Sequence, residues 1–209
     1  MSRSGQAERR PQDFYPTPGW VTRAILPHLA EDIDRGVVWE PAAGDGAILR
    51  EVLAFRPGLE REGRLWATEI DEGRVRRARE FAPTCHTDFL DCGPHRCSLI
   101  ITNPPYSIAE RFVSHALDLA GENATVAMLL RLAFLETRKR APFVRRHCPD
   151  VYVLPERPSF VEGPGRTQTD SCAYAWMVWP RGEKKRSSGR IEVLVPSAEV
   201  GQSTIASVL

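Results

Sequence analysis

Short apolar runs alternate with amphipathic stretches along most of this chain. The runs have the length, and the content of β-branched and aromatic residues, that buried strands have. Seven strands are predicted, at residues 36–40, 64–69, 84–89, 97–102, 124–132, 150–154 and 172–179. Strands that alternate with helices in this way favour an α/β fold with a mostly parallel sheet.

Four helices are predicted before or between these strands, at residues 17–29, 47–55, 71–81 and 109–120. The first begins at Thr17-Pro18, where threonine suits the N-cap and proline suits the first turn. The last has apolar side chains at helical spacing, namely Phe112, Val113, Ala116, Leu117 and Ala120. This spacing predicts a helix with one apolar face.

Two segments differ from this pattern. Residues 156–170, between the last two predicted strands, are rich in Gly, Pro and Arg, and long ordered loops in compact domains are often functional. From Arg181 the chain becomes polar and basic, with the composition of a linker, although residues 190–195 have the pattern of one extra strand. We therefore expect one domain over residues 1–180 and a basic, polar tail over residues 181–209.

The composition is that of an ordinary soluble protein. The 209 residues are 42% hydrophobic and 26% charged, which is enough for one sizeable core. The formal net charge of +1 predicts no global affinity for polyanions, so nucleic-acid binding would need a local basic patch. No apolar run approaches the length of a membrane span, and the polar N-terminus lacks a signal-peptide core.

The cysteines are scattered and odd in number: Cys85, Cys92, Cys97, Cys148 and Cys172. This usage favours free thiols in a cytoplasmic protein. Some of them lie near His86 and His95, but the spacing matches no pattern of paired zinc ligands. We therefore expect no metal site.

The tetrapeptide Asn103-Pro104-Pro105-Tyr106 follows the apolar run 98–102. The amide oxygen of Asn103 and a backbone carbonyl can both accept hydrogen bonds from a planar amino group. Two prolines fix φ at consecutive positions and hold such acceptors still, and Tyr106 offers a flat face on which a base can stack. Asn-Pro and Pro-Pro also mark ordinary turns, so this interpretation depends on the residues upstream.

Acidic residues end the first two predicted strands. Glu40 precedes a turn of small residues at 41–46 and suits a ligand ammonium group. The turn lacks the glycine spacing of a dinucleotide fingerprint, so a dinucleotide ligand is disfavoured. Glu69 ends the next strand, where an acidic residue can accept both hydroxyls of a ribose.

Asp88 ends the third predicted strand and can accept a hydrogen bond from an adenine amino group. Phe89 or Ile70 can cover the faces of the ring, although each alone is more often a core residue. Ligands bind at the carboxyl edge of such parallel sheets. Asn103 follows the fourth strand at that edge, so the sequence predicts one nucleotide-sized site there.

These motifs resemble those of the S-adenosylmethionine-dependent amino-methyltransferases, specifically the N6-adenine DNA methyltransferases, over residues 13–180. Five motifs carry the resemblance: Tyr15-Pro16-Thr17-Pro18, Glu40-Pro41-Ala42-Ala43-Gly44-Asp45-Gly46, Glu69-Ile70-Asp71, Asp88-Phe89 and Asn103-Pro104-Pro105-Tyr106. Their order is similar to the γ arrangement of that family.

The resemblance implies a three-layer Rossmann-like class I methyltransferase fold. Its sheet would have seven mostly parallel strands, the last one antiparallel. The resemblance also implies S-adenosylmethionine as the cofactor and Asn103, Pro104, Pro105 and Tyr106 as the catalytic residues. The cofactor-binding residues that it implies are Tyr15, Thr17, Pro18, Glu40, Pro41, Ala42, Gly44, Asp45, Gly46, Glu69, Ile70, Asp88, Phe89 and Asn103.

Besides Tyr106, three residues are candidates for binding nucleic acid. Phe160 follows the sixth predicted strand, where members of that family place an aromatic residue that stacks on the target base, and a core role for it stays equally open. Arg157 and Arg166 can meet phosphates. No segment fits a target-recognition domain, because only 30 residues follow Trp179. Recognition is therefore expected to be loose, to use residues 156–170 and the tail, or to need a partner or a second copy.

The predicted reaction is methyl transfer to the N6 amino group of adenine in DNA. Adenine in RNA stays an open alternative, since RNA adenine methyltransferases have a similar tetrapeptide. Release-factor glutamine methyltransferases also have it, but they carry an extra N-terminal helical domain that this sequence does not match. A non-catalytic binding module is least favoured, because it has no need for a rigid pair of acceptors. Restriction–modification, phage self-modification and regulatory methylation all fit, in a bacterial or phage setting.

Overall fold

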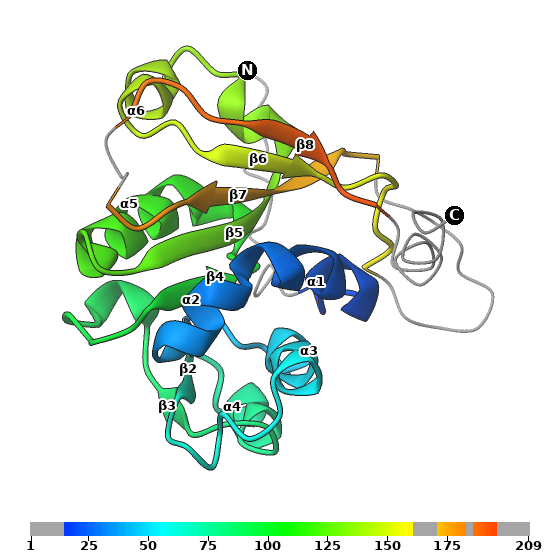
Figure 1. Cartoon of the computed structure of the whole chain (residues 1–209), viewed down its shortest axis with the longest axis vertical. Helices are drawn as coiled ribbons and strands as arrows, with labels where there is room; N and C mark the ends of the chain where they lie inside the picture. The colour runs from blue at the N-terminus through cyan, green and yellow to red at the C-terminus, as the bar shows by residue number, and fades with distance from the viewer. Residues whose placement is uncertain (1–14, 161–170, 183–185, 196–209) are drawn as a thin grey trace, which may run out of the picture.

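The computed structural model describes residues 15–160, 171–182 and 186–195 (Figure 1). The strands are β1 (Val38–Glu40), β2 (Leu65–Glu69), β3 (Thr84–His86), β4 (Leu99–Thr102), β5 (Thr125–Arg131), β6 (Asp150–Val153), β7 (Tyr174–Trp179) and β8 (Ile191–Val193). They form one sheet in the order β3-β2-β1-β4-β5-β7-β6-β8. Only β7 among these strands runs antiparallel to its neighbours. The predicted α/β fold is confirmed, and the extra strand expected at residues 190–195 is β8.

The described residues form short helices around the sheet. They are α1 (Gly19–Ile25), α2 (Ala30–Arg35), α3 (Ala47–Phe55), α4 (Glu72–Ala78), α5 (Ala109–Ala120) and α6 (Ala141–Arg146), with 3-10 turns η1 (Leu26–Leu29), η2 (Phe89–Asp91), η3 (Tyr106–Ile108) and η4 (Leu132–Leu135). None of the described helices has both the length and the apolar content needed to cross a membrane. The sequence did not predict α2 or α6.

The helix predicted over residues 17–29 is confirmed in part, since α1 covers Gly19–Ile25 and the 3-10 turn η1 covers Leu26–Leu29. The helix begins at Gly19, with Pro18 as its N-cap residue, and Thr17 makes no capping hydrogen bond. It ends at Ile25 because Pro27 has no backbone N–H to continue the ladder. The chain continues through η1 into the separate helix α2.

Two helical layers cover the two faces of the sheet, which gives three layers in all (Figure 1). Side chains alternate between the faces along each strand. Val38 packs with α1, α2 and α3, whereas the adjacent Trp39 packs with α5. Ile101 and Ile100 of β4 divide in the same way. Strands buried on both faces explain why their sequences are continuous apolar runs.

The strand order places a topological switch between β1 and β4. From β1 the chain moves outward through β2 to β3, and it then returns to β4 on the other side of β1. Connections that leave two neighbouring parallel strands in opposite directions open a crevice at their carboxyl ends. Glu40 ends β1 and Asn103 follows β4, so both residues lie at this crevice.

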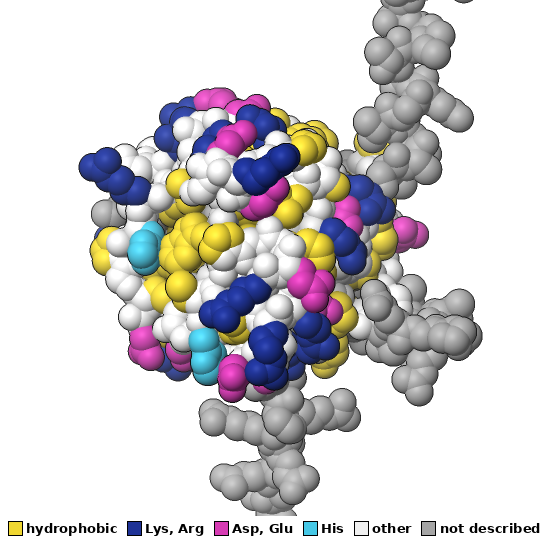
Figure 2. Space-filling view, turned by 90° about the horizontal axis from the view of Figure 1, so that it is seen from below, with side chains coloured by type: hydrophobic (Ala, Val, Ile, Leu, Met, Phe, Trp, Pro, Cys, Tyr) yellow, Lys and Arg dark blue, Asp and Glu magenta, His cyan; other side chains and the backbone are white. Residues whose placement is uncertain are grey.

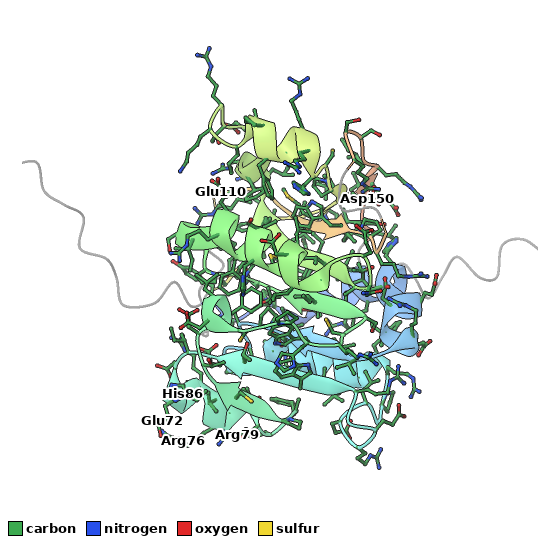
Figure 3. The ribbon with its side chains drawn as sticks, turned by 90° about the vertical axis from the view of Figure 1, so that its left-hand side faces the viewer. Glu72, Arg76, Arg79, His86, Glu110 and Asp150 are labelled. Carbon is green, nitrogen blue, oxygen red and sulfur yellow. The ribbon has the colours of Figure 1, made fainter. Side chains whose placement is uncertain are left out.

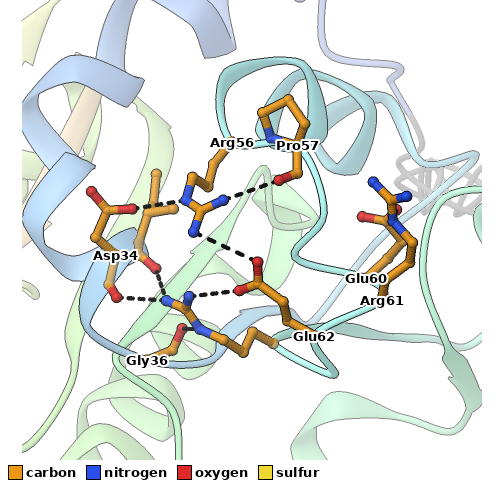
Figure 4. A network of polar contacts seen from close by, with 9 residues as sticks. Asp34, Gly36, Arg56, Pro57, Glu60, Arg61 and Glu62 are labelled. Atoms are coloured by element: carbon orange, nitrogen blue, oxygen red, sulfur yellow. Dashed lines mark hydrogen bonds and ion pairs between the residues drawn. The ribbon is translucent and has the colours of Figure 1, made fainter.

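A polar network holds the opposite ends of β1 and β2 in place (Figure 4). The Arg64 guanidinium donates to the backbone carbonyls of Ile33, at 2.7 Å, and of Gly36, at 3.1 Å. Arg56 bonds to the Asp34 carboxylate at 3.1 Å. These contacts join α2 to the segment between α3 and β2, so they fix the starts of the strands whose far ends carry the site.

Candidate active site

A deep pocket opens at the crevice between β1 and β4, and we call it the sheet-edge pocket. It encloses about 900 Å³ including its open mouth. Its walls come from the N-terminal segment, from the ends of β1 and β2, and from the residues after β3 and β4. Among the residues expected to bind the cofactor, those that line it are Tyr15, Thr17, Glu40, Pro41, Ala42, Gly44, Asp45, Glu69, Ile70, Asp88, Phe89 and Asn103.

The turn between β1 and α3 brings the backbone to the edge of this pocket. Gly46 has a φ of 87°, in the left-handed region that favours glycine. A Cβ atom on Gly46 would lie 2.4 Å from the ring of Phe81. The Ala43 amide donates to the Thr68 carbonyl at 3.1 Å, which joins the turn to β2. Gly46 therefore shapes the turn from outside the pocket lining, whereas Gly44 lines the pocket.

The Glu40 carboxylate is buried in the pocket wall, and none of the described cations pairs with it. The residue is 1% exposed, and its Oε2 atom has no hydrogen-bond partner. Burial raises the pKa of Glu40 well above its ordinary value, the Glu69 carboxylate raises it further, and a hydrogen bond from the Leu49 amide lowers it. A carboxylate that has already lost its water gains strongly from a cationic partner. Glu40 therefore fits a ligand ammonium group.

Glu69, at the end of β2, is satisfied where Glu40 is not. Its Oε2 accepts from the Gly44 amide at 2.7 Å, and its Oε1 accepts from the Asp71 amide at 2.9 Å. A carboxylate offers about four lone-pair sites, so acceptor capacity remains on a group that the backbone holds still. This arrangement can receive the two hydroxyls of a ribose.

Asp88, Phe89 and Ile70 form the far side of the pocket. Asp88 Oδ1 accepts from the Leu90 amide at 2.9 Å, so one of its two oxygens caps η2. Phe89 is buried against Trp39 and Phe112, so it is a core residue that also reaches the pocket. Ile70 is 56% exposed at the rim. An adenine ring between these two side chains would have one fixed wall and one adaptable wall.

The orientation of the Asn103 amide is fixed by the N-terminal segment. Its Nδ2 donates to Thr17 Oγ1 at 3.0 Å and to the Tyr15 carbonyl at 3.4 Å. A carbonyl only accepts, so the nitrogen must face it and the oxygen must point the other way. Asn103 Oδ1 is buried and has no hydrogen-bond partner. An orphaned acceptor of this kind indicates a donor that arrives with a ligand.

A second acceptor follows in the chain. The described residues make no hydrogen bond to the Pro104 carbonyl. Pro105 is the N-cap residue of η3, and its own carbonyl accepts from the Ile108 amide. Burial raises the pKa of the Tyr106 hydroxyl, and Asn103 lowers it. The two side chains are therefore neighbours. Tyr106 Oη and Asn103 Oδ1 nevertheless both lack a partner at hydrogen-bonding geometry.

The Tyr106 ring lies in an aromatic cluster. Tyr15 stacks on it with ring centroids 6.5 Å apart, and Tyr174 packs at 5.6 Å. Phe160 is 7% exposed and contacts Tyr15 and Tyr174 at 5.8 and 5.1 Å. Phe160 therefore lies in the core of this cluster, beside Tyr106 but out of solvent.

Arg131 is a neighbour of the site that the sequence analysis missed. Its guanidinium lies over the Tyr106 ring, 5.0 Å from the centroid, and its Nε donates to the Tyr174 hydroxyl at 3.1 Å. The available signal was the position of Arg131 at the carboxyl end of β5, the same edge that holds Glu40 and Glu69. Tyr174 pairs with Arg131 in the β5–β7 register, a relationship that no local pattern reveals.

A second cavity, the Tyr106 groove, lies on the other side of the loop 103–106. It encloses about 1260 Å³ including open space, and Tyr106, Ser107, Arg131 and Lys139 are among its lining residues. Asn103 lines only the sheet-edge pocket, Tyr106 lines only the groove, and Ile108 lines both. The loop is therefore a partition between two spaces.

The remaining predicted residues lie elsewhere. Arg157 is exposed in the segment after β6, and Arg166 lies outside the described residues. Pro18 and Gly46 flank the pocket without lining it. None of the five cysteines, all of which lie in the described residues, forms a disulfide. The described part of the chain also holds no cluster of three or more His, Cys, Asp or Glu residues that could bind a metal.

The sheet order, the three layers and the crevice between β1 and β4 define a Rossmann-like class I methyltransferase fold. The structure of a putative class I S-adenosylmethionine-dependent methyltransferase from Listeria monocytogenes has it, with a TM-score of 0.60 and 14% identity over 88% of this chain and 67% of that one. No protein-family model matches the chain, and no curated protein does.

Two further solved structures share the fold. A putative RNA methyltransferase from Pyrococcus horikoshii matches with a TM-score of 0.58 and 16% identity, over 84% of this chain and 93% of that one. A modification subunit of a putative type I restriction enzyme from Vibrio vulnificus matches with a TM-score of 0.57 and 17% identity, over 81% of this chain. The chain spans 45% of that subunit. At these identities the likeness shows the fold, and the activity has to be argued from the site.

Proposed function

We propose that this chain transfers a methyl group from S-adenosylmethionine to the N6 amino group of adenine in DNA. One observation carries the proposal: Asn103 Oδ1 is held in place and unsatisfied, next to the free Pro104 carbonyl. Two adjacent acceptors match the two hydrogens of a planar amino group. Their loop separates the sheet-edge pocket from the Tyr106 groove, so a methyl donor and an acceptor base can approach it from opposite sides.

The sheet-edge pocket fits S-adenosylmethionine, which supplies a methyl group on a positively charged sulfur. Glu40 would hold the ammonium group of the methionine part, since its buried carboxylate lacks a partner. Glu69 would accept the ribose hydroxyls, and Asp88 would accept from the adenine amino group between Ile70 and Phe89. The segment at Tyr15–Pro18 would close the pocket over the methionine carboxylate.

Asn103 and Pro104 would act on the acceptor nitrogen. The N6 lone pair of adenine is delocalised into the ring, so the free base is a poor nucleophile. Hydrogen bonds to the two acceptors favour a pyramidal nitrogen, and they strengthen as positive charge develops on it. Two prolines and the Thr17 contact hold the acceptors still, which keeps the nitrogen in line for transfer. The extra proton leaves after transfer, so no general base is needed beforehand.

The Tyr106 groove would take the target base. In a duplex the base has to leave the stack, which costs a few kcal/mol. Stacking on Tyr106 offsets part of that, since an aromatic side chain contributes about 1–3 kcal/mol per base. Phe160 supports the aromatic cluster from behind, and Arg157 and Arg166 stay candidates for phosphate contacts. Sequence recognition would be loose or would depend on a partner.

DNA is favoured over RNA by the order of the motifs and by the likeness to a modification subunit of a restriction enzyme. Adenine in RNA is the second candidate. The observation that favours RNA is the match to the putative RNA methyltransferase, which this chain covers to 93%.

The test uses methyl-labelled S-adenosylmethionine with adenine-containing DNA, RNA of the same sequence and total protein in separate reactions. We expect label in DNA, recovered as N6-methyladenine. Asn103→Ala is expected to lower the rate by about 10²-fold or more, whereas the exposed Asn123→Ala serves as a matched control. Label in protein alone would contradict the substrate, and a wild-type rate for Asn103→Ala would contradict its role.

A further inference from the structure

The segment between β5 and β6 is the most basic part of the described chain. Residues 132–149 carry five Lys and Arg residues and one acid, so their formal charge is +4, whereas the rest of the chain sums to −3. This segment forms η4 and α6. The near-neutral charge of the whole protein therefore hides a strong local asymmetry, and local charge is what attracts a polyanion.

This segment is anchored to the body of the protein. Arg140 donates to the carbonyls of Phe134 and Ala133, both at 2.8 Å, and its guanidinium lies over the Phe134 ring. Phe134 is buried against the sheet, and Phe143 and Val144 of α6 pack on the same cluster. The segment therefore presents its other cations from a fixed base.

Four cations of this segment, Arg138, Lys139, Arg145 and Arg146, form what we call the α6 basic surface. All four are exposed, and no acidic group among the described residues pairs with any of them. Arg138, Arg145 and Arg146 line one shallow hollow. Figure 3 shows nitrogen-tipped side chains that extend away from the molecule at this end.

Elsewhere on the described surface, nine arginines are paired with acidic groups. The arginines in ion pairs are Arg23, Arg35, Arg50, Arg56, Arg61, Arg64, Arg76, Arg181 and Arg186. Figure 2 shows the end of the molecule opposite α6, where basic and acidic side chains lie beside one another. An unpaired group of four cations repels itself unless an anionic partner covers it.

The α6 basic surface also continues into the candidate active site. The Tyr106 groove is lined by Tyr106 together with Arg131, Lys139 and Arg140, so it includes one of the four cations, Lys139. A strand whose base enters the groove beside Tyr106 thus has its backbone directed along η4 and α6. A nucleic-acid strand carries many phosphates, so several exposed cations can contact it at once.

We propose that the α6 basic surface binds the phosphate backbone of the DNA that carries the target adenine. This inference rests on the proposed function, because it takes the base in the groove to be the target. Contacts to phosphates supply affinity and orientation but no sequence information. The surface would therefore let the protein hold its substrate with loose sequence specificity.

The test changes the four cations together, as Arg138→Gln, Lys139→Gln, Arg145→Gln and Arg146→Gln. The matched control has the same charge change on the opposite end, as Arg50→Gln, Arg61→Gln, Arg76→Gln and Arg77→Gln. Binding of a short adenine-containing duplex is measured over a range of salt concentrations. Each lost phosphate contact reduces the slope of log affinity against log salt by about 0.9. The slope of the α6 variant is therefore expected to be smaller in magnitude by about 3 to 4, and its binding at least tenfold weaker.

Turnover and a second nucleic acid separate the possible failures. The α6 variant is expected to have a raised KM for DNA, and its S-adenosylmethionine affinity and melting temperature are expected to be unchanged. A wild-type salt slope in a variant that still methylates DNA would overturn the surface and leave the proposed function standing. A slope change with RNA of the same sequence and none with DNA would overturn the assignment to DNA. A wild-type protein that methylates no adenine would instead overturn the proposed function.

Discussion

Asn103 Nδ2 donates to Thr17 Oγ1 at 3.0 Å, across 86 residues of chain. This contact joins the end of β4 to the segment that precedes α1. It also decides which way the Asn103 amide faces, because the nitrogen is engaged and the oxygen is left for a ligand.

Thr17→Val is therefore expected to impair catalysis through Asn103. Valine keeps the shape of the side chain but removes the hydroxyl that holds Nδ2, so the amide can rotate. We expect kcat to fall about fivefold, in line with one neutral hydrogen bond of about 1 kcal/mol, while Thr17→Ser restores it. The measurement is steady-state turnover with DNA, with S-adenosylmethionine affinity as a separate readout. An unchanged kcat in Thr17→Val would show that the contact does not position the amide.

Glu40→Gln is expected to stabilise the cofactor-free protein at neutral pH. The folded pKa of Glu40 is raised by burial, so its contribution favours folding below the ordinary value of 4.5 and is lost as the pH rises through the raised pKa. Glutamine has no such loss. The melting temperatures of the two proteins should coincide at acid pH and separate in favour of the variant as the pH rises.

The same change is expected to weaken S-adenosylmethionine binding by 10- to 100-fold, on the order of one charge-assisted hydrogen bond. Calorimetry checks this, with the exposed Glu122→Gln as control. If Glu40→Gln bound S-adenosylmethionine as tightly as the wild type does, Glu40 would not be the group that holds the ammonium. Greater stability together with weaker binding would show that the buried charge is kept for the ligand.

Tyr106→Phe is expected to keep wild-type turnover, whereas Tyr106→Ala is expected to lower it. The hydroxyl is buried without a partner, so its removal should leave turnover intact and cost no stability. Removal of the ring takes away a stacking contact that contributes about 1–3 kcal/mol to base binding. We therefore expect a raised KM for DNA and a lower kcat. Loss of activity in Tyr106→Phe would instead assign a chemical role to the hydroxyl.

Gly46→Ala is expected to unfold more readily than Gly63→Ala. Both glycines have positive φ, 87° and 67°, so both substitutions carry backbone strain of about 1–3 kcal/mol. Only at Gly46 does the new Cβ also meet a neighbour, the Phe81 ring at 2.4 Å, whereas nothing lies within 4 Å of the Cβ at Gly63. Urea unfolding of the two variants measures the difference, and equal losses would refute the steric contribution.

Much of the fold could be predicted because its signals are local. Strands buried on both faces are continuous apolar runs, and each predicted run contains an observed strand. The carboxyl-edge rule then placed Glu40, Glu69, Asp88 and Asn103 together, and the pocket lining includes all four.

The remainder depends on contacts between distant parts of the chain. Threonine is a residue type that often serves as an N-cap, but the Thr17 hydroxyl accepts a hydrogen bond from Asn103 instead. No sequence pattern near Thr17 indicates that partner. Arg131 reaches Tyr106 through the pairing of β5 with β7, which joins residues far apart in sequence. The segment of α6 is short and strongly charged, so its few apolar residues gave no helical period.

The partition at residues 103–106 has a consequence for inhibition. Ile108 belongs to both of the spaces that the loop separates, so the two spaces are neighbours along one wall. A compound with a nucleoside at one end and a purine at the other, joined by a short bridge past Asn103, would fill both at once. Linking makes the second attachment intramolecular, at an effective concentration in the mM range. Such a two-headed ligand would bind far more tightly than either half, and it would discriminate against methyltransferases whose two sites are spaced differently.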